Sequence, residues 1–144
     1  MSIHSRVQDA LLLWKNGRHE GAFVNILLAV DATALKKYPD MKKKAGARIT
    51  RFLTEASGIR LSVEYSGECK PVEDLLYKWF RCEVAHAGGL PSNIEFMPDT
   101  EPGTRSVRAG GAPDYVLKVS YGWFDFLVQA VVNDEVNRDW HDQA

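Results

Sequence analysis

Apolar residues recur every three to four positions over several long stretches, and this pattern constrains the fold more than any other feature of the sequence. A helix places such residues on one face, and that face must be buried against another element. The stretches that predict helices are residues 2–14, 18–37, 41–56 and 120–136. A chain of 144 residues fits a single domain over 1–144. The pattern therefore predicts one mainly α domain.

A further helix is predicted from Pro71 to Pro91. Pro71 suits the first helical position, and Gly88-Gly89 before Pro91 is a typical helix ending. Glu83 and His86 fall on its broad apolar face, which is formed by Val72, Leu75, Leu76, Trp79, Phe80 and Cys82. Arg81 points elsewhere, about 140° from His86 in an ideal helix. The two side chains would meet only if the helix loosens near its end or a second chain supplies one of them.

Short strands are predicted between some of the helices. Ile59 to Tyr65 alternates apolar and polar residues, which favours a strand or an extended connector. Asn93–Met97 and Tyr115–Val119 could form a β-hairpin around the loop from Pro98 to Pro113, which is rich in Gly and Pro. We therefore expect an antiparallel four- to five-helix bundle with a small β-hairpin insertion before the last helix.

Asp31 lies inside the apolar stripe of the helix predicted for residues 18–37. A carboxylate in such a place needs a cation or a hydrogen-bond donor. Arg81 and His86 are the candidate partners. The alternative is that Asp31 sits at the edge of the stripe and reaches water.

A local basic segment runs from Lys36 to Arg51, although the net charge of the whole chain is −1. Asp40 is the one acid within it, and it also suits the N-cap of the helix that follows. Lys44, Arg48 and Arg51 are predicted to form a stripe opposite the apolar face, where they could follow a phosphate backbone. The alternative is an ordinary solvated helix face.

Arg81, four intervening residues and His86, at the end of a late helix, resemble the Arg-x4-6-His motif of the HEPN superfamily. Residues 17–38 are also similar to the second half of the first HEPN hairpin. The resemblance covers the helices but not residues 91–119. It implies a helical bundle that is often dimeric. Many members are metal-independent ribonucleases that act as toxins or in phage defence, and they need no cofactor.

The resemblance also implies a role for each residue of the motif. His86 would be the general acid or base and Arg81 would stabilise charge on the phosphate, while Asp31 or Glu83 would orient one of them. Cys82 departs from the polar residue that commonly follows the Arg in active members. The alternative is therefore a non-catalytic dimeric module that binds RNA, a nucleotide or a partner protein. Implied partners are a second copy, RNA, and a cognate antitoxin or nucleotidyltransferase.

Other chemistries lack the residues that they need. Glu83 and His86 match one half of a di-iron site, but no second Glu-x-x-His is present. Cys69 and Cys82 have no metal-ligand spacing and are predicted to be free thiols in a reducing cytoplasm, the alternative being a disulfide between them. His4, His19 and His141 have no ligand-like neighbours in the sequence and are expected at the surface. No apolar run approaches the ~20 residues of a membrane span, and no signal-peptide core is present.

Overall fold

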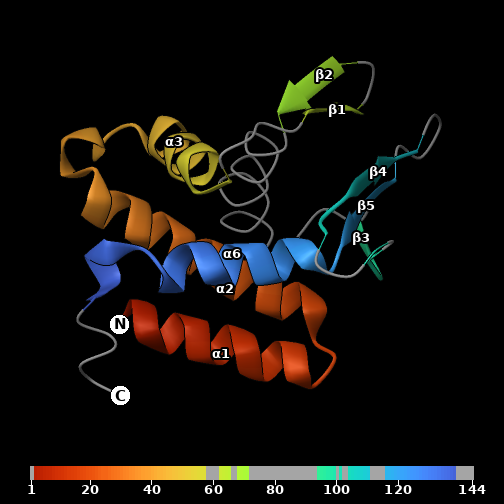
Figure 1. Ribbon diagram of the computed structural model, residues 1–144, viewed down its shortest axis with the longest axis horizontal. Coiled ribbons are helices and arrows are strands. Elements are labelled where there is room, and N and C mark those ends of the chain that lie inside the picture. Colours follow the sequence, from red (N-terminus) through yellow and green to blue (C-terminus); the bar gives the residue numbers. More distant parts are fainter. Residues whose placement is uncertain are drawn as a thin grey trace.

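The computed structural model describes residues 2–57, 62–65, 68–71, 94–99, 101, 104–110 and 116–138 of the chain. Four α-helices dominate this part (Figure 1). They are α1 (Ile3–Lys15), α2 (His19–Lys37), α3 (Ala45–Ser57) and α6 (Gly122–Val132). Two short 3₁₀ turns, η1 (Pro39–Met41) and η3 (Glu135–Asn137), follow α2 and α6. The prediction of a mainly α protein is confirmed at this level.

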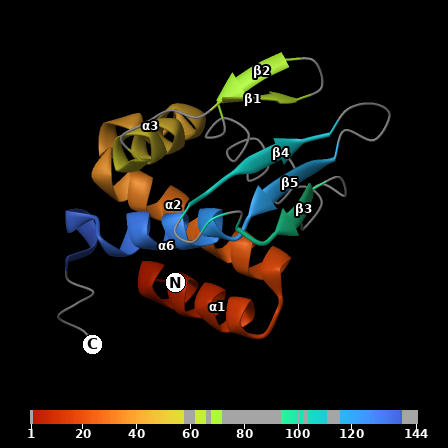
Figure 2. The same ribbon diagram turned by 45° about the vertical axis from the view of Figure 1, so that its right-hand side comes forward.

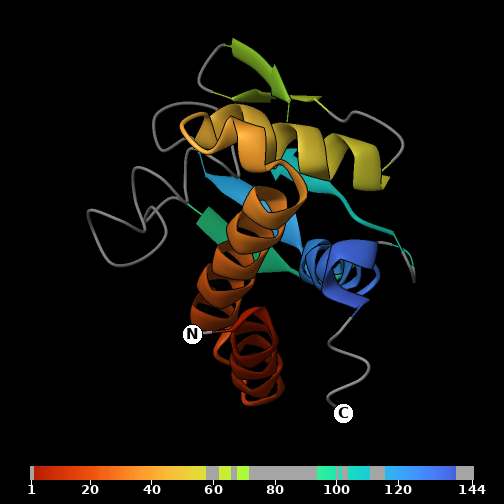
Figure 3. The same ribbon diagram turned by 90° about the vertical axis from the view of Figure 1, so that its left-hand side faces the viewer.

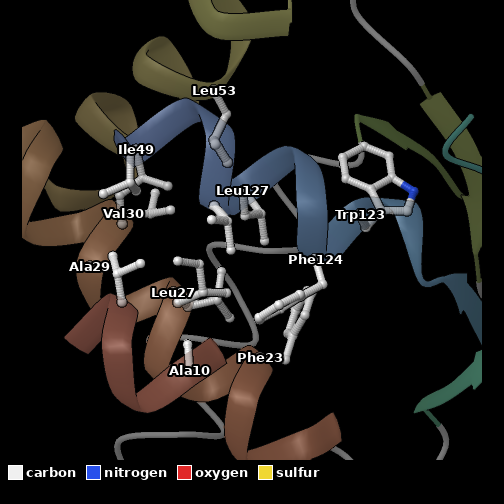
Figure 4. Packing of buried hydrophobic residues seen from close by; sticks show 14 of the residues in the cluster. Ala10, Phe23, Leu27, Ala29, Val30, Ile49, Leu53, Trp123, Phe124 and Leu127 are labelled. Carbon is white, nitrogen blue, oxygen red and sulfur yellow. The ribbon is translucent and has the colours of Figure 1, made fainter. Parts of the chain in front are cut away.

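The helices meet around α2. The chain reverses between α1 and α2 at Gly17, whose φ of 75° suits a residue without a Cβ. Figure 3 shows α3 crossing near the end of α2, with α6 alongside. The close view in Figure 4 shows Leu127 and Phe124 of α6 facing Leu27 and Phe23 of α2. These residues are all buried, so helices from both ends of the chain share one core.

A buried hydrogen bond joins the end of the described chain to α2. The Nδ2 of Asn137 donates to the Oγ1 of Thr33 at 3.1 Å and to the carbonyl of Val131 at 2.9 Å. Nearby, the Nζ of Lys37 lies 2.8 Å from the carboxylate of Asp134. The turn after α6 is therefore held against the last turns of α2.

The start of α3 differs from its prediction. The helix begins at Ala45, whereas Asp40 lies inside η1 and does not cap the helix. Pro39 explains the difference because its fixed φ suits the first residue of a short helical turn. Residues 42–44 then connect η1 to α3.

Three strands form a small sheet with the order β3-β5-β4 (Figure 2). They are β3 (Ile94–Met97), β4 (Val107–Ala109) and β5 (Leu117–Ser120). β3 pairs with β5 in parallel, with Ile94 opposite Leu117, and β4 pairs with β5 antiparallel, with Val107 opposite Val119.

The prediction that residues 93–97 and 115–119 form a β-hairpin is therefore wrong. A hairpin pairs its strands antiparallel, whereas β3 and β5 pair in parallel. Parallel strands need a connection of a dozen or more residues, and the long segment between Met97 and Leu117 provides one. The same segment was predicted to be a loop, but it contributes β4. A hairpin does precede α6, and it is formed by β4 and β5.

A separate two-stranded sheet pairs β1 (Ser62–Tyr65) with β2 (Glu68–Pro71). It confirms the strand predicted to end at Tyr65. Pro71, however, ends β2 opposite Ser62 and does not begin a helix. A proline is tolerated at a strand end because its missing N–H is not needed by an inner ladder. The remainder of the helix predicted up to Pro91 lies outside the described residues.

Candidate functional site

The predicted catalytic residues Arg81, Glu83 and His86 lie outside the described residues. Their roles and mutual geometry therefore remain predictions. Asp31 and the predicted RNA-binding residues Lys44, Arg48 and Arg51 lie in α2, α3 and the turn between η1 and α3.

Asp31 forms a close ion pair with Arg48. Its Oδ1 accepts from the Nη2 of Arg48 at 2.8 Å and from the Nε at 3.2 Å. The side chain of Asp31 is 24% exposed and that of Arg48 only 7%. Asp31 thus has a cation as its partner, as expected, and among the described residues that cation is Arg48. The candidate partners Arg81 and His86 lie outside the described residues.

Arg48 is buried, so its predicted place on a solvated basic stripe is wrong. Its Nη1 donates to the carbonyl of Lys42 at 2.8 Å and to that of Met41 at 3.3 Å. One helical turn separates Arg48 from the buried Phe52, which puts both on the inner face of α3. That spacing is the sequence feature from which the burial of Arg48 could have been recognised.

Lys42, one of the two residues whose carbonyls Arg48 binds, begins a turn of three consecutive lysines, Lys42–Lys44, which we call the lysine turn. All three are exposed. The backbone N–H of Lys44 donates to the carbonyl of Met41, and the carbonyl of Lys44 accepts from the N–H of Arg48. The turn therefore leads directly into α3, whose first turn contains no acidic residue. Ammonium groups beside the positive end of a helix attract anions.

Arg51 is exposed but is not a free cation. Its Nε lies 3.2 Å from the Oε1 of Glu55, and its guanidinium lies 4.2 Å from the centre of the Tyr38 ring. The hydroxyl of Tyr38 donates to the other oxygen of Glu55. Burial, and then this hydrogen bond, raise the pKa of Tyr38 to about 12, whereas the hydrogen bonds from Tyr38 and Arg51 lower the pKa of Glu55. This cluster joins the end of α2 to α3.

An aromatic cluster at the other end of α2 was not predicted. The ring of His19 lies 4.3 Å from that of Trp14 and 4.9 Å from that of Tyr121, so His19 is partly buried and not a simple surface residue. Trp14 also stacks on Phe124 at 4.1 Å. These contacts join α1, α2 and α6, and they explain why an apparently isolated histidine is placed here.

Depressions mark the surface of the described part, and two of them lie beside its helices. The larger, of about 690 Å³, lies beside the turn from α1 to α2 and is lined by Leu13, Gly17, Arg18, His19, Glu20, Gly21, Val24 and Asn25. The smaller, of about 260 Å³, lies between α3 and α6. Within the described ranges, no group of His, Cys, Asp and Glu side chains could hold a metal ion. Nor is any described helix both long and apolar enough to cross a bilayer.

The described part is that of a small, mainly helical protein with a fixed basic turn next to a partly buried ion pair. The chain belongs to the Rv1289 family, whose model matches residues 2–143. No curated protein and no solved structure matches the chain. The family match thus covers nearly the whole sequence, but it does not by itself specify a reaction.

Proposed function

We propose that this protein is a HEPN-like, metal-independent endoribonuclease of the cytoplasm, acting as a toxin or in phage defence. The observation that supports this most is the spacing of Arg81 and His86 in a late predicted helix. The helical character of the described part is compatible with a HEPN-like bundle. The exposed lysine turn adds a local attraction for a polyanion, which the net charge of −1 alone does not supply.

In this proposal, two copies pair so that Arg81 and His86 line one cleft. His86 removes the proton from a ribose 2′-hydroxyl, because its unperturbed pKa is near neutral. The hydroxyl oxygen attacks the adjacent phosphorus, and the bond from phosphorus to the 5′-oxygen of the next nucleotide breaks. That leaving oxygen takes up the proton that His86 removed. Arg81 stabilises the negative charge that builds up on the phosphate. Glu83 remains the candidate to orient one of them, since Asp31 already binds Arg48.

The test is cleavage of several RNAs in the presence of a chelator. The parent protein is compared with His86→Ala and Arg81→Ala at matched folded fraction and oligomeric state. Arg108→Ala is the control, because it removes an exposed cation from β4. Loss of general acid–base catalysis lowers rates by about 100- to 10,000-fold, and loss of one charge-stabilising group by about 100- to 1,000-fold. Both motif variants should therefore lose cleavage while the control retains it.

A second candidate is a non-catalytic dimeric module that binds RNA, a nucleotide or a partner protein such as an antitoxin or a nucleotidyltransferase. Two observations favour it. Cys82 stands where active HEPN members commonly have a polar residue, and Asp31 is engaged in a structural ion pair. This candidate predicts that the parent cleaves none of the RNAs and that both motif variants lose their dimer. Cleavage by the parent in chelator would rule it out.

A further inference from the structure

We infer that the lysine turn, Lys42–Lys44, is the RNA-phosphate contact of this protein and that the Asp31–Arg48 pair is the device that positions it. The inference deepens the proposed function and rests on RNA being the partner. It differs from the predicted stripe of Lys44, Arg48 and Arg51, because Arg48 moves from the contact surface to the support beneath it.

The first argument is the neutralisation of neighbouring cations. Lys37 pairs with Asp134, Arg48 with Asp31, and Arg51 with Glu55. In the described part of the chain, none of Lys42, Lys43 and Lys44 lies within ion-pair distance of a carboxylate. The positive charge of residues 37–51 is therefore concentrated at this turn and is not spread along a helix face.

The second argument is the way in which the turn is held. Three adjacent ammonium groups repel one another, and an unsupported turn would respond by spreading them apart. Here the guanidinium of Arg48 binds the carbonyls of Met41 and Lys42 from inside the molecule, and Asp31 fixes the guanidinium in turn. Because the backbone of the turn is already held in place, binding costs less conformational entropy, which favours affinity.

The third argument concerns the type of anion. Asp40 and the lysines are exposed, and Met41, the apolar residue of this segment, is partly buried against the core. Segments that bind a membrane surface insert apolar side chains into the lipid. Residues 40–44 have no exposed apolar side chain that could do so. A chain of phosphates needs only charge at short spacing, which the turn supplies.

The experiment measures binding of a 2′-O-methyl RNA, which lacks the attacking hydroxyl and cannot be cleaved by the proposed route. The parent is compared with the triple variant Lys42→Gln, Lys43→Gln, Lys44→Gln. Losing three phosphate contacts should reduce the slope of log affinity against log salt by about 2. Between about 50 and about 200 mM salt, the parent should then lose roughly 20-fold more affinity than the variant.

The matched control removes the same charge elsewhere with Lys15→Gln, Arg108→Gln and Lys118→Gln, all at exposed positions. It should retain the parental slope if the turn acts as a specific contact. A second variant, Arg48→Lys, keeps a cation for Asp31 but loses the fork that reaches two carbonyls. It should weaken RNA binding at matched folded fraction while leaving most of the salt slope in place.

Equal binding and equal slopes for the parent and the lysine variant would overturn the inference. So would an equal loss in the charge-matched control, because net charge alone would then explain the effect. Binding of the parent and the lysine variant to phosphatidylserine vesicles is measured as well. If the lysine variant loses vesicle binding but binds RNA as the parent does, the inference is also overturned. This experiment measures binding only, and cleavage is measured in the separate test with chelator. A parent protein that binds RNA here but does not cleave RNA in that test refutes only the ribonuclease proposal.

Discussion

The Asp31–Arg48 pair is where a single residue should matter most for stability. Replacing Asp31 by Asn leaves a largely buried guanidinium without its carboxylate, which should cost about 2 kcal/mol or more in the free energy of unfolding. Arg48→Met should cost a similar amount. The double variant should cost less than the sum of the two, because neither charge is then left alone. Chemical denaturation of the four proteins checks this, and strictly additive costs would contradict a direct pair.

The same pair shows how far sequence reasoning reaches at this scale. The need of Asp31 for a cation follows from its place among apolar neighbours, and that expectation is correct. The identity of the cation does not follow, because α2 and α3 meet only in three dimensions. Arg81 and His86 are candidates for their chemistry alone, whereas the packing of α3 on α2 brings Arg48 to Asp31. Charge alone predicts a surface residue, whereas the spacing to Phe52 indicates burial.

Tyr38 should make stability depend on alkaline pH. Folding raises its pKa from 10.0 to about 12, so the folded state favours the protonated hydroxyl. Its contribution is complete below about pH 10 and is lost as the pH rises through about 12. The difference in unfolding free energy between the parent and Tyr38→Phe should therefore shrink across that window. Lysines also titrate in this range, but they do so in both proteins and therefore cancel in the difference. A difference that stays constant from pH 9 to 12 would contradict a pH-dependent contribution of Tyr38.

At the scale of elements, two helical glycines should respond in opposite ways to alanine. A methyl group on Gly122 would overlap the carbonyl of Thr104, close to where the Gly122 N–H donates to Asp99. Gly122→Ala should therefore cost about 1–3 kcal/mol. A methyl group on Gly21 would meet Leu13 at 3.4 Å, an ordinary contact, so Gly21→Ala should stabilise α2 by up to about 1 kcal/mol. Thermal unfolding of both variants distinguishes these signs.

Elements differ in how well the sequence predicts them, for a physical reason. Repeated apolar spacing predicts α1, α2, α3 and α6 because a helix is specified by neighbours three and four residues away. Alternation of apolar and polar residues also predicts β5, in which Leu117 and Val119 are buried and Lys118 between them is exposed. Strand direction depends on the path of the intervening chain, which no local pattern describes. The parallel β3–β5 pair and the insertion of β4 therefore could not be predicted from those segments alone.

For the whole molecule, the hydrogen bond from Asn137 to Thr33 should act as a closing contact. Both side chains are buried, so Asn137→Ala would leave the Thr33 hydroxyl and the Val131 carbonyl without this donor. We expect a loss of about 2 kcal/mol in the free energy of unfolding and faster amide exchange in the last turns of α2. Glu135→Ala, at an exposed position of the same turn, is the control and should change little. Equal effects of the two variants would contradict the closing role.

The separation of 104 residues between Thr33 and Asn137 has a consequence for the protein while it is still being made. A ribosome releases α1 and α2 long before it releases α6, whose Phe124 and Leu127 cover the apolar face of α2. During that interval the nascent chain exposes the surface that will become its core. Such an intermediate is the kind that chaperones bind and that aggregates when they are lacking. The late synthesis of α6 should make this small protein unusually dependent on protection during translation.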